Sequence, residues 1–302
     1  MEENKKKRIA ILGSTGSIGT QALEVIAEHP DLYEAYALTA NNRVDLLIEQ
    51  ARRFMPDAVV IANESKYPQL KEALADPEGV AALRPEAIAP LVEGLMLSGF
   101  AMQAARSSRP ASCTDHLFSH LWNMRNHTYN GVTPSHGFQV SVGTLCMCAM
   151  FDEAYKSDFT TLDVERCVAA WPSLEEVRAA AERLFANESF AELGVTEITA
   201  KYDDKEEVRR QMQLLKSNWP DLKARLQAQC YTYDEMYRYL SIVGAPTKPE
   251  DVGITKAQML ADVPFVRHIR RRYNLLDLGL RAGTLDTWVN GVFGKGGIWE
   301  VQ

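Results

Sequence analysis

The 302-residue sequence predicts a mixed fold, in which an α/β segment at residues 1–76 is followed by an all-α domain at residues 77–302. In the first part, three short apolar runs alternate with amphipathic stretches, which is typical of parallel strands joined by helices. A stretch containing two prolines and a glycine follows at residues 76–85, where a domain boundary is expected. Beyond it, the apolar residues recur almost everywhere at helical spacing.

The first expected strand, at residues 9–12, runs directly into the segment 13–19, Gly-Ser-Thr-Gly-Ser-Ile-Gly. Helical spacing then predicts a helix that begins near Ser17 and continues to Glu28. A strand, a glycine turn and a helix N-terminus together form an anion site, because the first N–H groups of the helix carry partial positive charge. Ser14, Thr15 and Ser17 would add hydroxyl donors. A tight turn that binds nothing is the alternative interpretation.

The second expected strand, at residues 33–38, is followed by Asn41, Asn42 and Arg43. A dinucleotide-binding fold commonly carries an acidic residue here, which holds the ribose 2′-hydroxyl. Amide donors and a guanidinium instead favour a 2′-phosphate, and therefore NADPH over NADH. Alternatively, Asn41 or Asn42 caps the helix expected at residues 44–53, and both interpretations can hold together. A third strand at Ala58–Ile61 and a helix near Ser65 complete half of a Rossmann fold.

Residues 1–76 resemble the N-terminus of 1-deoxy-D-xylulose 5-phosphate reductoisomerase, an NADPH-dependent enzyme family of isoprenoid biosynthesis. The resemblance is carried by residues 11–19, residues 37–43 and the expected helix at residues 44–51. It implies two sets of cofactor-binding residues. The phosphates of NADPH would lie at the loop formed by Gly13, Thr15, Gly16, Ser17, Ile18 and Gly19, and the adenosine ribose with its phosphate would lie at Asn41, Asn42 and Arg43.

The second part of the chain is expected to contain helices near residues 86–106, 113–126, 136–155, 173–185, 205–215 and 232–242. Prolines at positions 172, 220, 246, 249 and 264 are expected to separate helices. Residues 265–280 read as one basic, apolar-striped helical region that ends at Gly283. The glycine-rich segment from Gly291 to Gly297 is expected to be a flexible tail.

A histidine cluster is the second candidate functional stretch. His116 and His120 are four residues apart and share a helical face, and His136 lies where the next helix should begin. Two imidazoles on neighbouring helices can hold a divalent metal such as zinc, usually with a carboxylate that completes the set. The alternative is that the histidines are structural, because their spacing is not a fixed ligand motif.

Residues 77–302 resemble the helical domain of sn-glycerol-1-phosphate dehydrogenase, in the iron-containing alcohol dehydrogenase superfamily. The resemblance is carried by residues 93–99, 108–112, 115–120, 136–140, 143–145 and 269–277. It implies that His116 and His136 bind a catalytic metal, with His120 as a neighbour. The sequence departs from the family by Cys113, where a glycine is usual, and by lacking the segment that carries the family's metal-binding aspartate. Asp115 is a poor replacement, because it is adjacent to His116 and points away from its face.

The two resemblances together imply an NAD(P)H-dependent oxidoreductase that acts on a small phosphorylated ketone or sugar phosphate. NADPH is the expected cofactor, NADH the second option, and a divalent metal the expected partner of the histidines. No catalytic residue is assigned. The alternatives are a non-catalytic NADPH-binding protein, or a fusion product in which neither active site is complete.

Composition restricts the other classes. A net charge of −7 and a pI near 5.5 argue against a nucleic-acid-binding protein. No apolar stretch is expected to reach membrane-spanning length, so no membrane partner is expected. Five cysteines and an N-terminus without a signal-type apolar region predict reduced thiols in the cytoplasm. Homo-oligomerisation is left open.

Overall fold

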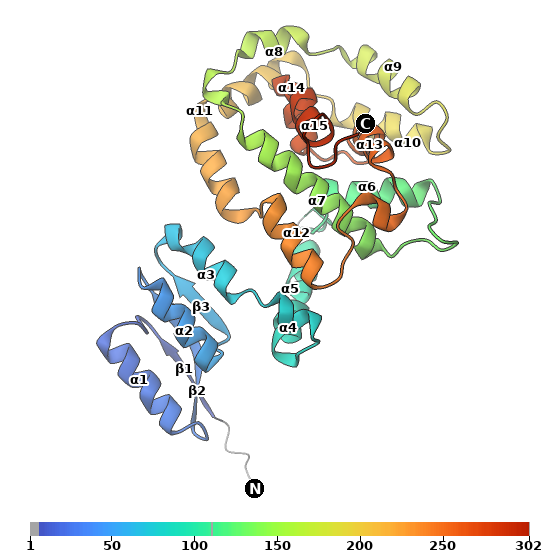
Figure 1. The fold of residues 1–302 in the computed structure, drawn as a ribbon. Coiled ribbons are helices and arrows are strands. Elements are labelled where there is room, and N and C mark those ends of the chain that lie inside the picture. The colour runs from blue at the N-terminus through green and yellow to red at the C-terminus, as the bar shows by residue number, and fades with distance from the viewer. Residues whose placement is uncertain (1–5, 110, 302) are drawn as a thin grey trace. The chain divides into compact units, whose positions relative to one another are not determined.

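The computed structural model describes residues 6–109 and 111–301. The chain divides into two compact units, Met1–Asp76 and Pro77–Gln302 (Figure 1). The boundary between the units along the chain lies where proline and glycine interrupt the sequence pattern. Each unit has its own hydrophobic core, and each is described separately below.

The N-terminal unit contains a parallel sheet with the strand order β1-β2-β3. Two of its helices, α1 and α2, pack against β2. Leu38 and Leu47 are fully buried between these layers. The elements are β1 (Lys7–Ile11), α1 (Ser17–Glu28), β2 (Tyr33–Ala40), α2 (Val44–Phe54), β3 (Ala58–Ile61), the 3₁₀ turn η1 (Glu64–Lys66) and α3 (Tyr67–Leu74). The predicted α/β class is therefore confirmed.

Two strand ends differ from the prediction, and both differences shape the loop after β1. Strand β1 ends at Ile11, which leaves Leu12 in the loop with 84% of its surface exposed. Strand β2 continues two residues further than expected, because Thr39 and Ala40 still pair with Val60 and Ile61 of β3. The carboxyl end of β2 therefore lies beside the loop that follows β1.

The C-terminal unit is helical, and its described part contains only an isolated bridge between Tyr129 and Val132 besides helices and turns. Its core lies around α7, which packs against α6, α12 and α15. The elements are α4 (Pro77–Ala81), α5 (Pro85–Ala104), α6 (Thr114–Met124), α7 (His136–Tyr155), the 3₁₀ turn η2 (Phe159–Thr161), α8 (Val164–Ala170), α9 (Leu174–Leu184), α10 (Ala191–Lys201), α11 (Lys205–Gln229), α12 (Tyr233–Ile242), the 3₁₀ turn η3 (Pro249–Val252), α13 (Lys256–Val266), α14 (Leu275–Ala282) and α15 (Leu285–Phe293). The predicted helical remainder is confirmed.

Several predicted details of this unit are wrong. Pro220 and Pro264 do not end helices but lie inside α11 and α13. The region 265–280 is not one helix, because α13 ends at Val266 and α14 begins only at Leu275, where the Asn274 side chain caps it. The region after Gly291 is not a free tail either. Trp299 is 3% exposed, and its backbone N–H donates to the carbonyl of Val292.

The expectation that no apolar stretch reaches membrane-spanning length is also wrong. Among the described residues, α5 is a 20-residue helix that is long and apolar enough, by length and composition alone, to cross a membrane. None of its residues is buried, and Leu95, Met96 and Phe100 are each more than half exposed. The helix is thus apolar without being part of either core.

Candidate functional site

The loop between β1 and α1 is anchored to the end of β2. Gly13 has a φ of +81°, a left-handed conformation that glycine adopts without strain. Its N–H donates to Thr39 Oγ1 at 2.9 Å, and the N–H of Ser14 donates to the Thr39 carbonyl at 2.8 Å. These two bonds explain why β2 must extend to Thr39 for the loop to hold its shape.

Ser14 and Gln50 form a second anchor beneath the loop. The Ser14 hydroxyl donates to Gln50 Oε1 at 2.8 Å, and Gln50 Nε2 donates to the Ser14 carbonyl at 2.9 Å. Ser14 is fully buried and Gln50 is 6% exposed, so this pair is shielded from solvent. The Ser14 hydroxyl is therefore used internally rather than offered to a ligand. Sequence reasoning missed Gln50, although a glutamine on the buried face of α2 was a visible signal.

The N-terminus of α1 is open to an anion. Its N-cap is Gly16, no side chain caps the first turn, and no acidic residue lies in that turn. Ser17 and Ile18 are exposed, with Ile18 at 81%. At Gly19, a Cβ would come within 2.4 Å of the Gly13 carbonyl oxygen. The loop can therefore lie this close to α1 only because position 19 is a glycine. Free N–H groups at an uncapped, exposed helix N-terminus are what a phosphate group requires.

Arg43 links the second predicted set of residues to this loop, because its Nη1 donates to the Thr15 carbonyl at 2.8 Å. Asn41, Asn42 and Arg43 are all exposed beside the loop. The alternative prediction that Asn41 or Asn42 caps α2 is wrong, since the N-cap residue is Arg43 and no side chain caps the helix. The Asn42 Oδ1 instead accepts from Asn63 Nδ2 at 2.6 Å, a partner that the sequence did not reveal.

The structure also brings the predicted histidines together. The ring centroids of His116 and His136 are 5.4 Å apart, and those of His120 and His136 are 5.9 Å apart. The cause is a close crossing of α6 and α7. A Cβ at Gly143 would come within 2.3 Å of the Asp115 carbonyl oxygen, so only glycine at that position permits this approach.

The imidazole rings of His116 and His136 each have a polar partner. His116 Nδ1 lies 3.0 Å from Asp115 Oδ2, and His136 Nδ1 lies 2.8 Å from Ser119 Oγ. Burial is the largest single influence on Asp115 and opposes its ionisation, but the hydrogen bonds from His116 and from the Cys113 N–H, together with the attraction of the imidazole, outweigh burial and lower the pKa of the carboxyl. Burial, together with the nearby Arg270 guanidinium, lowers the pKa of His120. His120 is therefore favoured in its neutral form near pH 7.

The residues present do not complete a metal site. Among the residues that the structure describes, no group of three His, Cys, Asp or Glu side chains could hold a metal ion. Asp115 does not supply the missing carboxylate, since it accepts hydrogen bonds from His116 and from the N–H of Cys113. It orients an imidazole, which is the role that a carboxylate has behind a metal-bound histidine. Only two or three imidazoles remain, which falls short of the ligand set that the resemblance implies.

Comparison with known proteins identifies relatives of the N-terminal unit. Residues 9–96 match the family model of 1-deoxy-D-xylulose 5-phosphate reductoisomerase. The reductoisomerase of Bacteroides fragilis is 82% identical over 76 residues, and that of Phocaeicola vulgatus is 86% identical over 71 residues. The chloroplastic enzyme of Oryza sativa subsp. japonica is 53% identical over 70 residues. The predicted resemblance of the first 76 residues is therefore confirmed.

These matches cover a limited part of each chain. The Bacteroides fragilis match includes 25% of this chain and 20% of the relative, the Phocaeicola vulgatus match 24% and 19%, and the Oryza sativa match 23% and 15%. The chain thus spans about a fifth of the length of the curated relatives it matches. These matches give no support to the predicted resemblance of residues 77–302 to sn-glycerol-1-phosphate dehydrogenase. No solved structure matches the chain.

Proposed function

We propose that the N-terminal unit binds the phosphate-bearing half of a nicotinamide dinucleotide and prefers NADPH to NADH. The observation that carries this proposal is the uncapped, exposed N-terminus of α1 behind a glycine loop that Thr39, Gln50 and Arg43 hold in place. The pyrophosphate would accept hydrogen bonds from the N–H groups at the start of α1. The similarity to the reductoisomerase family over the same residues supports the choice of ligand.

The preference for NADPH rests on Arg43. Its guanidinium is exposed at the end of β2, where a 2′-hydroxyl would call for an acidic residue and a 2′-phosphate for a cation. One of its N–H groups already donates to the Thr15 carbonyl, which leaves the remaining donors for a phosphate. Arg43 therefore has two roles, because it positions the loop and it would contact the ligand.

These roles can be separated by titrating NADPH and NADH into the unchanged protein and into Arg43→Ala. Loss of the loop contact weakens both cofactors, whereas loss of the 2′-phosphate contact weakens NADPH alone. The affinity ratio of NADPH to NADH should therefore fall by about tenfold or more in Arg43→Ala, since a hydrogen bond to a charged group contributes roughly 1.5–3 kcal/mol. Arg53→Ala, which removes an exposed arginine from the helix that Arg43 precedes, is the control and should leave the ratio unchanged. Equal affinity of the unchanged protein for both cofactors would refute the preference.

The wider proposal is an oxidoreductase that reduces a small phosphorylated ketone or sugar phosphate in the cytoplasm. It is supported by the reductoisomerase similarity and by the cluster of His116, His120 and His136. Turnover of NADPH with dihydroxyacetone phosphate or 1-deoxy-D-xylulose 5-phosphate, lost in His136→Ala, is its test. Binding of NADPH without turnover of either substrate favours the alternative, a non-catalytic NADPH-binding protein.

A further inference from the structure

The connector between α13 and α14 carries the basic run that the sequence pattern placed inside a helix, and it packs firmly against the rest of the C-terminal unit. Ile269 is 2% exposed and anchors the connector in the core. Arg271 donates to Glu197 from its backbone N–H at 2.7 Å and from Nη2 at 2.9 Å. Arg270 and Arg272, on either side of Arg271, therefore occupy defined positions.

Arg272 joins this connector to the segment before α6. Its Nη1 donates to the Ser112 carbonyl at 2.5 Å, and its Nη2 donates to Ser108 Oγ at 2.6 Å. Both partners are neutral, and the two bonds use only two of the five N–H groups of the guanidinium. The remaining donors of Arg272 can bind a ligand.

The same segment leads into the histidine cluster. The N–H of Cys113 donates to Asp115 Oδ1 at 3.2 Å, and Asp115 Oδ2 lies 3.0 Å from His116 Nδ1. Arg270 also lies close to the cluster, because its guanidinium is the largest influence after burial that lowers the pKa of His120. The connector and the histidine cluster therefore border one region of the C-terminal unit.

Three guanidiniums meet in this region without a carboxylate partner. Besides burial, which is the largest influence, Arg270 and Arg109 lower the pKa of Arg272, so the three side chains lie within reach of one another's charge. Arg109 and Arg270 are exposed. None of the three forms an ion pair with any residue that the structure describes.

The carboxylates of Glu197 and Asp115 border the region, and both have partners. Glu197 attracts Arg270, but its Oε1 accepts from Arg271 Nη2 at 2.9 Å and its Oε2 accepts from the Arg271 N–H. Asp115 pairs with His116. Two carboxylates cannot neutralise the four arginines named above, so positive charge exceeds negative charge here.

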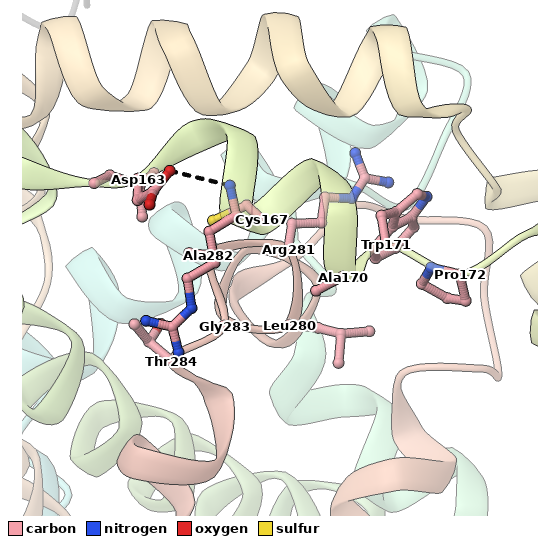
Figure 2. A pocket seen from close by; sticks show the side chains of 12 residues that line it. Asp163, Cys167, Ala170, Trp171, Pro172, Leu280, Arg281, Ala282, Gly283 and Thr284 are labelled. Atoms are coloured by element: carbon pink, nitrogen blue, oxygen red, sulfur yellow. Dashed lines mark hydrogen bonds between the residues drawn. The ribbon is translucent and has the colours of Figure 1, made fainter.

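The cavity in Figure 2 has the opposite balance. It is lined by α8 and by the turn between α14 and α15, and its volume is about 400 Å³. Its exposed arginine, Arg166, lines the cavity together with the exposed carboxylate of Asp163. The two charges offset each other, so this cavity has no preference for an anion, and Arg166 is a suitable control for the region around Arg270.

We propose that Arg109, Arg270 and Arg272 bind the phosphate group of a small phosphorylated molecule. Arginine presents its N–H groups in a planar fork that matches the oxygens of a phosphate. A phosphate group carries close to two negative charges near pH 7, which the excess positive charge of this region would balance. In the proposed function, these arginines would hold the phosphate of the ketone beside the histidine cluster. The inference rests on that function for the rest of the ligand, but not for the phosphate.

The test uses the full chain without NADPH and three probes in calorimetric titrations. Dihydroxyacetone phosphate and inorganic phosphate should both bind in the millimolar range or below, whereas uncharged dihydroxyacetone should bind at least tenfold more weakly than its phosphate. Arg270→Gln should weaken binding of the two phosphates by about tenfold or more, and Arg270→Lys, which keeps the charge, should weaken it less. Arg166→Gln is the matched control and should bind as the unchanged protein does.

Location is tested by alkylation of Cys113, followed by peptide mass spectrometry. Cys113 is exposed, and it lies close enough to Arg272 for its charge to raise the pKa of that guanidinium. Iodoacetate is an anion and iodoacetamide is neutral, so the ratio of their rates reports the local field and cancels the reactivity of the thiol itself. Arg270→Gln should lower this ratio several-fold at Cys113 and leave it unchanged at Cys167. Added dihydroxyacetone phosphate should slow both reagents at Cys113 alone.

The outcomes separate this site from the proposed function. The site is refuted if neither phosphate binds at millimolar concentration, if dihydroxyacetone binds as tightly as its phosphate, if Arg270→Gln binds as Arg166→Gln does, or if the rate ratio at Cys113 does not change. A protein that binds dihydroxyacetone phosphate but shows no turnover refutes the oxidoreductase and supports the site. Turnover with an unchanged KM in Arg270→Gln refutes the site and leaves the oxidoreductase standing.

Discussion

Gly19 offers a sharp test of the proposed cofactor loop, residues 13–19, because a single methyl group there should move the start of α1 away from the ligand. In Gly19→Ala, the new Cβ would lie 2.4 Å from the Gly13 carbonyl oxygen and 2.6 Å from Ser14 Cα, whereas ordinary contact begins at 3.4 Å. Relief therefore requires a displacement of 3.4 − 2.4 = 1.0 Å between the loop and α1. Leu23 and Ile26 are buried in the sheet core and oppose movement of the helix, so most of the displacement falls on the loop.

The effects on stability and on binding should differ. Overpacking costs about 1–3 kcal/mol, but replacing a helical glycine by alanine returns about 0.5–1 kcal/mol, so the free energy of unfolding changes little or falls moderately. Binding is more sensitive, because a displacement of about 1 Å removes the alignment of N–H donors with a phosphate. Each donor to a charged group contributes roughly 1.5–3 kcal/mol, and the affinity for NADPH should fall by about tenfold or more.

The assay is a fluorescence titration of NADPH, with thermal unfolding measured in parallel. Ala22→Gly is the matched control, since it weakens the same helix by about 0.5–1 kcal/mol without adding an atom near the loop. It should bind NADPH within a few-fold of the unchanged protein. If Gly19→Ala keeps full affinity while Ala22→Gly loses it, the helix rather than the close approach at Gly19 governs binding, and the proposed geometry is wrong.

Three further predictions concern other parts of the molecule. Gln50→Leu should destabilise the N-terminal unit by about 1–3 kcal/mol in urea unfolding, because it leaves the buried Ser14 carbonyl without its donor and the Ser14 hydroxyl with only the Thr39 carbonyl as acceptor; an unchanged midpoint would contradict this. Burial and the neighbouring Arg267 lower the pKa of His268 to about 3, so the unfolded chain binds this proton between about pH 6.5 and pH 3 and the native protein does not. Stability should therefore fall with falling pH in that window by up to about 1.4 kcal/mol per pH unit, and His268→Asn should flatten the slope in unfolding curves measured across it. Zinc should bind weakly in a competition assay with a chelating dye, and His116→Ala should abolish this binding, whereas His127→Ala should not, because His127 Nε2 lies 2.7 Å from the Val252 carbonyl and has a structural role; equal effects of the two substitutions would mean that the cluster is structural.

Local sequence patterns were sufficient where local contacts determine the structure. The start of α1 at Ser17, the third strand at Ala58–Ile61 and the helix at His136–Tyr155 all occur where the sequence predicts them. Apolar runs and helical spacing are visible within a few residues along the chain. The proximity of His116 and His136 also followed from their placement on two consecutive helices. The placement of Arg43 near the loop followed from its position just after the second strand.

The features that the sequence did not reveal depend on contacts between distant residues. Composition favoured a flexible tail after Gly291, but burial of Trp299 against Phe293 and Tyr233 holds it in place. Pro220 was expected to end a helix, yet α11 continues through it. The adjacent Trp219 is 3% exposed and donates to the Ser157 carbonyl at 3.0 Å, so tertiary packing outweighs the loss of one helical hydrogen bond. Gln50 was missed for the same reason, since its partner is 36 residues away.

The contacts that shape the cofactor loop all arise between residues 13 and 50, so binding of the adenosine phosphate half should depend on the N-terminal unit alone. A complete dinucleotide-binding fold contains two such halves, and the described part of this unit contains the strands of one. In the usual strand order, the strand that begins the second half pairs with β1, whereas here β1 pairs with β2 alone among the described strands. The groups that would hold a nicotinamide ring must then come from outside these three strands. Under the proposed function, binding of the phosphate-bearing half of the cofactor therefore requires only the N-terminal unit, whereas hydride transfer would require groups from elsewhere.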